Sequence, residues 1–144
     1  YVSGGNRDRP MIETYAGIVS DSGVGPTQPS GTATYSADYE YTLVTDVNAI
    51  TNQLSWRHGV RSGRVTLVAD FDAGTLRGNA GGFFRVDGTI SGRGLDGSVT
   101  VPVFRASSLT GDLEGSIGQD GVVGAFQGNR GTEAFAGGLV GTRR

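Results

Sequence analysis

Residues 32–44 have the sequence TATYSADYEYTLV, in which apolar or aromatic side chains alternate with polar ones. Successive side chains of a β-strand point to opposite faces, so this alternation predicts a strand with one buried face and one wet face. The residues that share the apolar face are Ala33, Tyr35, Ala37, Tyr39, Tyr41 and Leu43. The segment therefore predicts a sheet with its core on a single side.

The same period continues along the chain. RVTLVADF (64–71) places Val65, Leu67, Ala69 and Phe71 on one face. Further segments with alternating or β-rich composition, separated by turn-forming residues, occupy or lie within 11–19, 75–90, 94–104, 109–117, 121–128 and 134–142. No window has convincing helical periodicity. The sequence predicts an all-β domain of about eight antiparallel strands in an up-and-down meander.

Glycine recurs at inward positions of the last predicted strands, namely at Gly111, Gly115, Gly124, Gly128, Gly137 and Gly141. Glycine lets a strand coil sharply and leaves room for a large side chain from the opposite wall. This pattern favours a single closed barrel over an open sheet. A membrane-spanning barrel is rejected because the outward positions carry Asp38, Glu40, Arg85, Asp87, Asp96, Asp112 and Glu114 in place of lipid-facing apolar residues.

Length and composition limit the possible classes of protein. The chain of 144 residues has the size of one domain, with residues 1–10 as a flexible lead-in and residues 11–144 as the barrel. It contains no cysteine, which excludes disulfides and thiolate chemistry. Its arginines are scattered and its net charge is −2, so we expect no nucleic-acid partner. No apolar run approaches the ~20 residues that span a bilayer.

One polar and aromatic segment is a candidate binding patch. SWRHGVRSG (55–63) contains Trp56, Arg57, His58 and Arg61, and it is predicted to be a loop or a strand end. Tryptophan and arginine are favoured anchors in protein interfaces, so these side chains can form a contact surface. The alternative is structural, with the tryptophan capping the barrel mouth. A single histidine without cysteine does not make a usual zinc site, and we expect no metal and no cofactor.

The tyrosines of the first quoted strand allow two interpretations. Tyr35, Tyr39 and Tyr41 share the inward face, where their hydroxyl groups can line a ligand cavity. The same stripe equally fills a solid core, which is the favoured interpretation.

Few residues occur in the combinations that catalytic sites require, and we expect that the protein is not an enzyme. Asp70 and Asp72 can chelate calcium, but turn chemistry explains them better. Glu133 is interpreted as structural, with its carboxylate bonded to backbone N–H groups. No G-x-S-x-G elbow occurs, and His58 has no predicted partner for a nucleophilic triad.

Four stretches carry a resemblance to a known family: GTATYSADYEY (31–41), VTLVADFDAGTLRGN (65–79), FRVDGTISGRGLDGSVTV (84–101) and GAFQGNRGTEAFAGGLVGTRR (124–144). They resemble the strands and hairpins of the β-barrel domain in the bacterial transferrin-binding protein B family. The last stretch departs from the family ending at Gln127, Asn129 and Gly131. The resemblance implies a barrel of a surface lipoprotein that binds host proteins, located in the cell envelope or secreted.

These observations lead to two functional hypotheses. The first is a monomeric, non-catalytic binding module that recognises a protein or a protein-bound cofactor through loops at 20–31, 45–63 and 104–108. Any membrane contact would be made through an N-terminal lipid anchor outside this chain. The second is a carrier of the lipocalin or avidin kind, with a small apolar ligand inside the barrel. It requires an internal cavity of about 300 Å³ or more.

Overall fold

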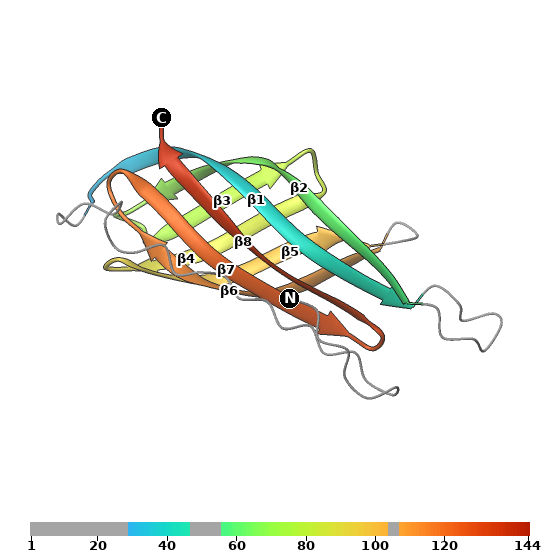
Figure 1. Cartoon of the computed structure of the whole chain (residues 1–144). Helices are drawn as coiled ribbons and strands as arrows, with labels where there is room; N and C mark the ends of the chain where they lie inside the picture. Colours follow the sequence, from blue (N-terminus) through green and yellow to red (C-terminus); the bar gives the residue numbers. More distant parts are fainter. Residues whose placement is uncertain (1–28, 47–55, 104–106) are drawn as a thin grey trace.

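The computed structural model describes residues 29–46, 56–103 and 107–144, and their regular secondary structure is entirely β (Figure 1). In chain order the strands are β1 (Thr32–Asp46), β2 (Trp56–Asp70), β3 (Thr75–Ala80), β4 (Phe84–Ser91), β5 (Gly94–Pro102), β6 (Ser108–Ile117), β7 (Gly121–Arg130) and β8 (Glu133–Arg143). The described part of the chain holds no helix with the length and apolar character needed to cross a bilayer.

These strands form one closed sheet. Each strand pairs antiparallel with the next, and β8 returns to pair with β1, from Tyr35↔Arg143 to Val44↔Ala134. The contact between the first and last strands lies along the front of the barrel in Figure 1. The predicted fold class, a closed up-and-down antiparallel barrel of about eight strands, is confirmed.

Two of the predicted elements need correction. Residues 75–90, within which one strand was predicted on the alternation from Phe84 to Ile90, contain two strands, β3 and β4. Gly81 and Gly82 adopt positive φ values of 61° and 74° and reverse the chain between them. The predicted loop 45–63 is also too long, since β1 continues to Asp46 and β2 begins at Trp56. The predicted strand 11–19 and most of the predicted loop 20–31 lie outside the described residues.

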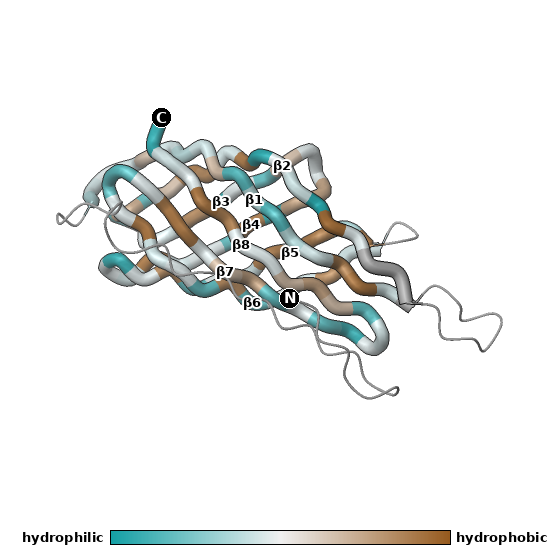
Figure 2. The backbone as a smooth tube through the Cα atoms, in the orientation of Figure 1, coloured by the Kyte–Doolittle hydropathy of each residue, from teal (hydrophilic) through white to brown (hydrophobic). Residues whose placement is uncertain are grey.

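The inward faces form one continuous core. Figure 2 shows apolar positions alternating with polar ones along the strands, as the sequence pattern predicts. The largest fully buried side chains include Tyr35, Phe84, Phe135, Leu67 and Leu76. They come from strands on different sides of the barrel, so residues far apart in sequence meet along its axis. Because removal of such apolar area from water drives folding, this core is the main source of stability.

Inward glycines allow neighbouring strands of the sheet to approach each other closely. Gly115 and Gly124 are register partners on β6 and β7. A Cβ atom at Gly115 would lie 2.8 Å from the Cα of Gly124, which is closer than real Cβ atoms come to backbone. Gly97 has the same relation to Gly88, at 2.6 Å. At these positions the missing side chain makes room for the backbone of the adjacent strand. The predicted room for a large side chain from the opposite wall stays a prediction.

The acidic turn residues have structural partners. Asp70 accepts a hydrogen bond from the Ala73 N–H at 2.8 Å, and Asp72 accepts one from the Gly31 N–H at 3.2 Å. Glu133 accepts from the Arg130 guanidinium at 2.7 Å, a side-chain partner in place of the predicted backbone N–H groups. Within the described residues, no three histidine, cysteine or acidic side chains gather in a way that could hold a metal ion.

Candidate binding site

The strand connections define two ends of the barrel. The connections β3–β4 (residues 81–83) and β7–β8 (131–132) lie at one end, which we call the Phe83 end. The connections β2–β3 (71–74), β4–β5 (92–93) and β6–β7 (118–120) lie at the other, which we call the Tyr35 end. The candidate site residues are divided between these two ends.

An aromatic cluster fills the barrel toward the Phe83 end. The rings of Tyr39 and Phe84 stack in parallel, with centroids 3.8 Å apart. Tyr41 lies 6.2 Å from both Phe84 and Phe135, and Phe126 meets Phe84 edge-on at 5.6 Å. Tyr41 and Phe84 are buried, whereas Tyr39 is only half-buried. The cluster therefore runs from the core to the protein surface through the Tyr39 ring.

Arg61 joins this cluster from β2. It is exposed and is the register partner of Tyr41. Burial raises the pKa of the Tyr41 hydroxyl, and the positive charge of Arg61 acts in the opposite direction. Tyr39 extends across β2 toward Gly63, where a Cβ atom would lie 2.6 Å from the Tyr39 hydroxyl. The structure thus brings together Tyr39, Tyr41 and Arg61 of the predicted site.

The predicted patch residues Trp56, Arg57 and His58 are the first three residues of β2, so of the two predicted placements, a loop or a strand end, the structure has the strand end. In the register they oppose Asp46, Thr45 and Val44 of β1, which places their backbone at the Phe83 end. Their side chains lie outside the described part of the structure. Whether they form a contact surface stays a prediction.

Phe83 is a candidate site residue that sequence reasoning missed. Its side chain is 69% exposed, at the tip of the β3–β4 hairpin. The turn is held by the Gly82 N–H, which donates to Asn79 Oδ1 at 2.8 Å, and by the Phe83 N–H, which donates to the Ala80 carbonyl at 3.1 Å. The signal in the sequence is the pair of phenylalanines after two glycines, because adjacent residues of a strand cannot both point inward.

Tyr35 lies away from this cluster, at the opposite end. Its buried hydroxyl donates to the Gly118 carbonyl at 2.6 Å and ties β1 to the β6–β7 connection. The predicted grouping of Tyr35 with Tyr39 and Tyr41 is wrong in this respect. Strand periodicity assigns a face to each tyrosine but does not bring the three to one place. Tyr35 is a structural residue of the Tyr35 end.

Replacing Tyr35 with phenylalanine is expected to lower the free energy of unfolding at neutral pH by about 1 kcal/mol, because the buried Gly118 carbonyl loses its donor. Burial raises the pKa of Tyr35 above its ordinary value; nearby Arg143 lowers it and Asp120 raises it, both to a smaller extent. The stabilisation by the neutral hydroxyl is therefore present below about pH 10 and is lost as the pH rises through the folded-state pKa.

The measurement is urea unfolding of the wild type and Tyr35→Phe at neutral pH and above about pH 10. The difference between the two proteins is expected to shrink at the higher pH. A difference that stays constant, or one that grows, would contradict the assigned role of the hydroxyl.

The interior near the Phe83 end is occupied by side chains. The rings of Tyr41, Phe84, Phe126 and Phe135 come from β1, β4, β7 and β8, and they lie within 6.3 Å of a neighbouring ring centroid. Gly128 lacks a side chain where the Phe135 ring lies, 2.6 Å from the position of a built Cβ atom. This packing supports the filled-core interpretation of the tyrosine stripe and disfavours a ligand inside the barrel.

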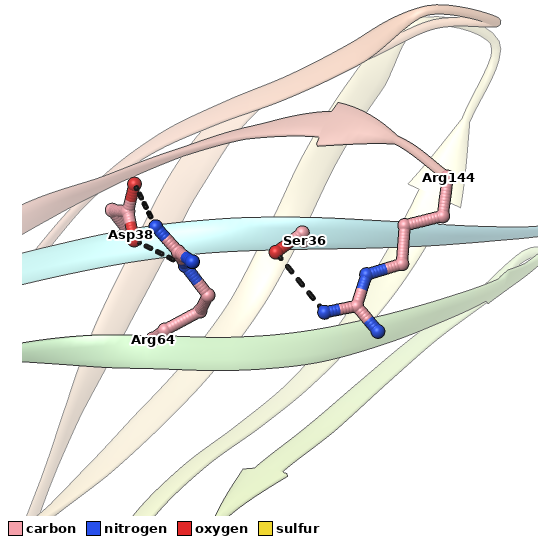
Figure 3. Close-up of polar contacts among 4 residues, drawn as sticks. All are labelled: Ser36, Asp38, Arg64 and Arg144. Atoms are coloured by element: carbon pink, nitrogen blue, oxygen red, sulfur yellow. Dashed lines mark hydrogen bonds and ion pairs between the residues drawn. The ribbon is translucent and has the colours of Figure 1, made fainter.

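A separate hollow of about 750 Å³ lies on the outer wall, across β2, β1, β8 and β7. Val140 and other apolar atoms line it, and an ion pair between Arg64 Nε and Asp38 Oδ1 at 2.7 Å stands at its rim. Figure 3 shows this pair beside a contact between the Arg144 guanidinium and the Ser36 hydroxyl. The hydrogen bond from Arg64 lowers the pKa of Asp38. The hollow is an open groove bridged by charged side chains.

The fold and the Phe83 end define a closed, filled barrel that presents aromatic and arginine side chains at one end. No protein-family model matches the chain, and no curated protein matches it. Among solved structures it is similar to a transferrin-binding protein B mutant from Haemophilus parasuis, with a TM-score of 0.63 and 14% identity. It is also similar to isotype 1 transferrin-binding protein B from serogroup B Neisseria meningitidis, with a TM-score of 0.57 and 14% identity.

The matches cover 79% and 85% of this chain, but only 26% of each solved chain. The chain therefore has the barrel fold found in transferrin-binding protein B, and it spans about a quarter of the length of those proteins. The resemblance predicted from the four sequence stretches is confirmed at the level of the fold.

Proposed function

We propose that this chain is a monomeric, non-catalytic binding module of a bacterial cell-envelope or secreted protein, and that it recognises a protein partner through its Phe83 end. The observation that carries the proposal is the exposed Phe83 side chain, held on a hydrogen-bonded glycine turn at the same end as Arg61 and Tyr39. Large aromatic and arginine side chains dominate the binding energy of protein interfaces.

The fold likeness supports the same class of function. The solved neighbours carry the name transferrin-binding protein B, which describes proteins that bind another protein. The barrel here corresponds to about a quarter of such a chain, so we carry over only the class, recognition of a protein at the bacterial envelope. Phe83 is 69% exposed, and burial of its ring by a partner would contribute favourably to the free energy of binding.

The test is differential capture from a mixture of serum proteins. The immobilised chain is compared with the double variant Phe83→Ser, Arg61→Glu and with the control Asp72→Asn, which lies at the Tyr35 end and retains an acceptor for Gly31. We expect a protein retained by the wild type and the control, with affinity for the double variant reduced about 30-fold or more. Both changes are at exposed positions, so the free energy of unfolding is expected to change by less than about 0.5 kcal/mol.

Retention of the same proteins by all three would contradict recognition through the Phe83 end. Retention of none above an empty matrix would contradict the binding function for serum partners altogether. The second alternative, a carrier of small apolar ligands, gains no support from the filled aromatic interior.

A further inference from the structure

Strand β2 can pair along both of its edges, and it is much longer than β3, its neighbour on the second side. On its first side, β1 pairs with every residue of β2. On its second side, β3 pairs only with residues 66–70. Among the strands that the structure describes, none pairs with this second side of residues 56–65. We call this stretch the free edge of β2.

The register shows which main-chain groups face the free edge. The Phe71 N–H donates to the Gly31 carbonyl at 2.9 Å, and the offset between β1 and β2 is constant along the ladder. Hydrogen-bonded pairs alternate in an antiparallel ladder, so the odd-numbered residues of β2 bond to β1. Residues 58, 60, 62 and 64 therefore direct their N–H and C=O groups away from β1. Such a row of groups is a template for another strand.

The free edge also has a distinct charge. Its sequence, WRHGVRSGRV, contains three arginines and no acidic residue, in a chain with a net charge of −2. Arg61 is exposed on the face that it shares with Tyr39, whereas Arg64 on the other face is already paired with Asp38. A second copy of this strand would bring three more arginines and no acidic residue, so it would offer no opposite charge to Arg61. An acidic strand would instead place carboxylates beside Arg61.

Residues around the free edge can contact every second side chain of a strand added there. Gly59 has open space where a side chain would be, with no atom within 4 Å of a built Cβ. The Tyr39 hydroxyl lies against Gly63, within the free edge. The β3–β4 turn with exposed Phe83 lies beyond the last β2–β3 pair and bounds the free edge on one side. β1 holds the edge in place because it also pairs with β8 over residues 35–44.

We propose that the free edge of β2 accepts an extended, acidic segment of a partner protein as an additional β-strand. The inference rests on the proposed function, since it specifies how the partner would be held beside the Phe83 end. Main-chain hydrogen bonds to residues 58, 60, 62 and 64 supply affinity, and carboxylates that alternate along the added strand select its sequence through Arg61.

The experiment measures amide hydrogen exchange of the full chain by NMR, alone and with a synthetic peptide of about ten residues that alternates glutamate with valine and threonine. With the peptide, exchange at Val60, Ser62 and Arg64 is expected to slow about tenfold or more. Arg61 and Gly63 bond to β1 and serve as internal references that stay unchanged. A matched peptide with lysine in place of glutamate is expected to cause no slowing.

Paired variants separate strand addition from other modes of binding. Ser62→Pro removes an N–H that faces the free edge without breaking the β1–β2 ladder, and it should abolish the slowing at Val60 and Arg64. Ser62→Ala keeps the N–H and should behave like the wild type. Slow exchange of these amides in the peptide-free chain would overturn the inference, because the edge would then already be occupied. No slowing with the acidic peptide, or equal slowing with the lysine peptide, would also overturn it.

Capture of a partner by the Ser62 variants distinguishes failure of strand addition from failure of the proposed function. A partner lost by the Phe83→Ser, Arg61→Glu variant but retained by Ser62→Pro would leave the proposed function standing and refute strand addition. A partner lost by both variants and retained by Ser62→Ala would support both.

Discussion

Gly111→Ala is expected to lower the free energy of unfolding by about 3 kcal/mol or more, because a single added methyl group has no space at this position. Gly111 points inward on β6, and its Cβ would overlap the carbonyl group of Gln127 and lie 2.6 Å from the Cα of Gly128. These are backbone atoms of the neighbouring strand, so no rotamer change can relieve the overlap. The sheet would have to shift between β6 and β7. Urea unfolding measures the loss.

Gly59→Ala is the matched control for this prediction. Gly59 also lies within a strand, but a Cβ there would meet no atom within 4 Å. Its substitution is expected to change the free energy of unfolding by no more than about 0.5 kcal/mol. Equal effects of the two substitutions would contradict the close approach of β6 and β7, since both exchange the same atoms at strand positions.

Phe84→Ala is expected to destabilise the barrel by about 3–5 kcal/mol. The side chain is only 1% exposed, it stacks on Tyr39 at a centroid distance of 3.8 Å, and it meets the Phe126 ring edge-on at 5.6 Å. Its removal would leave a cavity among rigid rings, which cannot collapse easily into the space. Thermal and urea unfolding would show the loss as a lower Tm and a lower urea midpoint.

The adjacent Phe83→Ala variant gives a direct comparison, because it deletes the same atoms at an exposed position. We expect it to change stability by less than about 0.5 kcal/mol. If Phe83→Ala proved as costly as Phe84→Ala, the hairpin would have to pack differently, and Phe83 would no longer be a candidate anchor for a partner.

The fold was largely predictable because successive strand residues of a barrel point alternately into the core and outward, which leaves an alternating apolar pattern in the sequence. The alternation in residues 32–44 lies within β1, and that in residues 64–71 lies within β2 up to Asp70, with Phe71 directly after the strand. β3 was not predicted as a separate strand because Leu76 is its one fully buried residue, so this short segment has little apolar period.

The first part of β2 was not predicted as a strand for a different reason. Its inward positions include Gly59, Arg61 and Gly63, which do not have the apolar period of a core-facing strand. The main-chain ladder to β1 defines this segment, and its pairs join residues that are ten or more positions apart in sequence. Local pattern analysis therefore assigned the segment to a loop.

The candidate site could be predicted only in part. Tyr39, Tyr41 and Arg61 were singled out from residue type, and the structure places them together at the Phe83 end. Tyr35 shares their face of β1 but lies toward the other end, where it bonds to Gly118. Phe83 was overlooked because its exposure depends on where the hairpin turns.

The sequence by itself determined that alternate residues of this chain face a common core and that glycines recur on the inward side, because side-chain direction in a strand follows from local backbone geometry. Only the tertiary structure decided which side chains share an end of the barrel and which stretch of β2 has no second neighbour among the described strands. Those features depend on the stagger between strands, and stagger is set by pairing between segments that are distant in the chain.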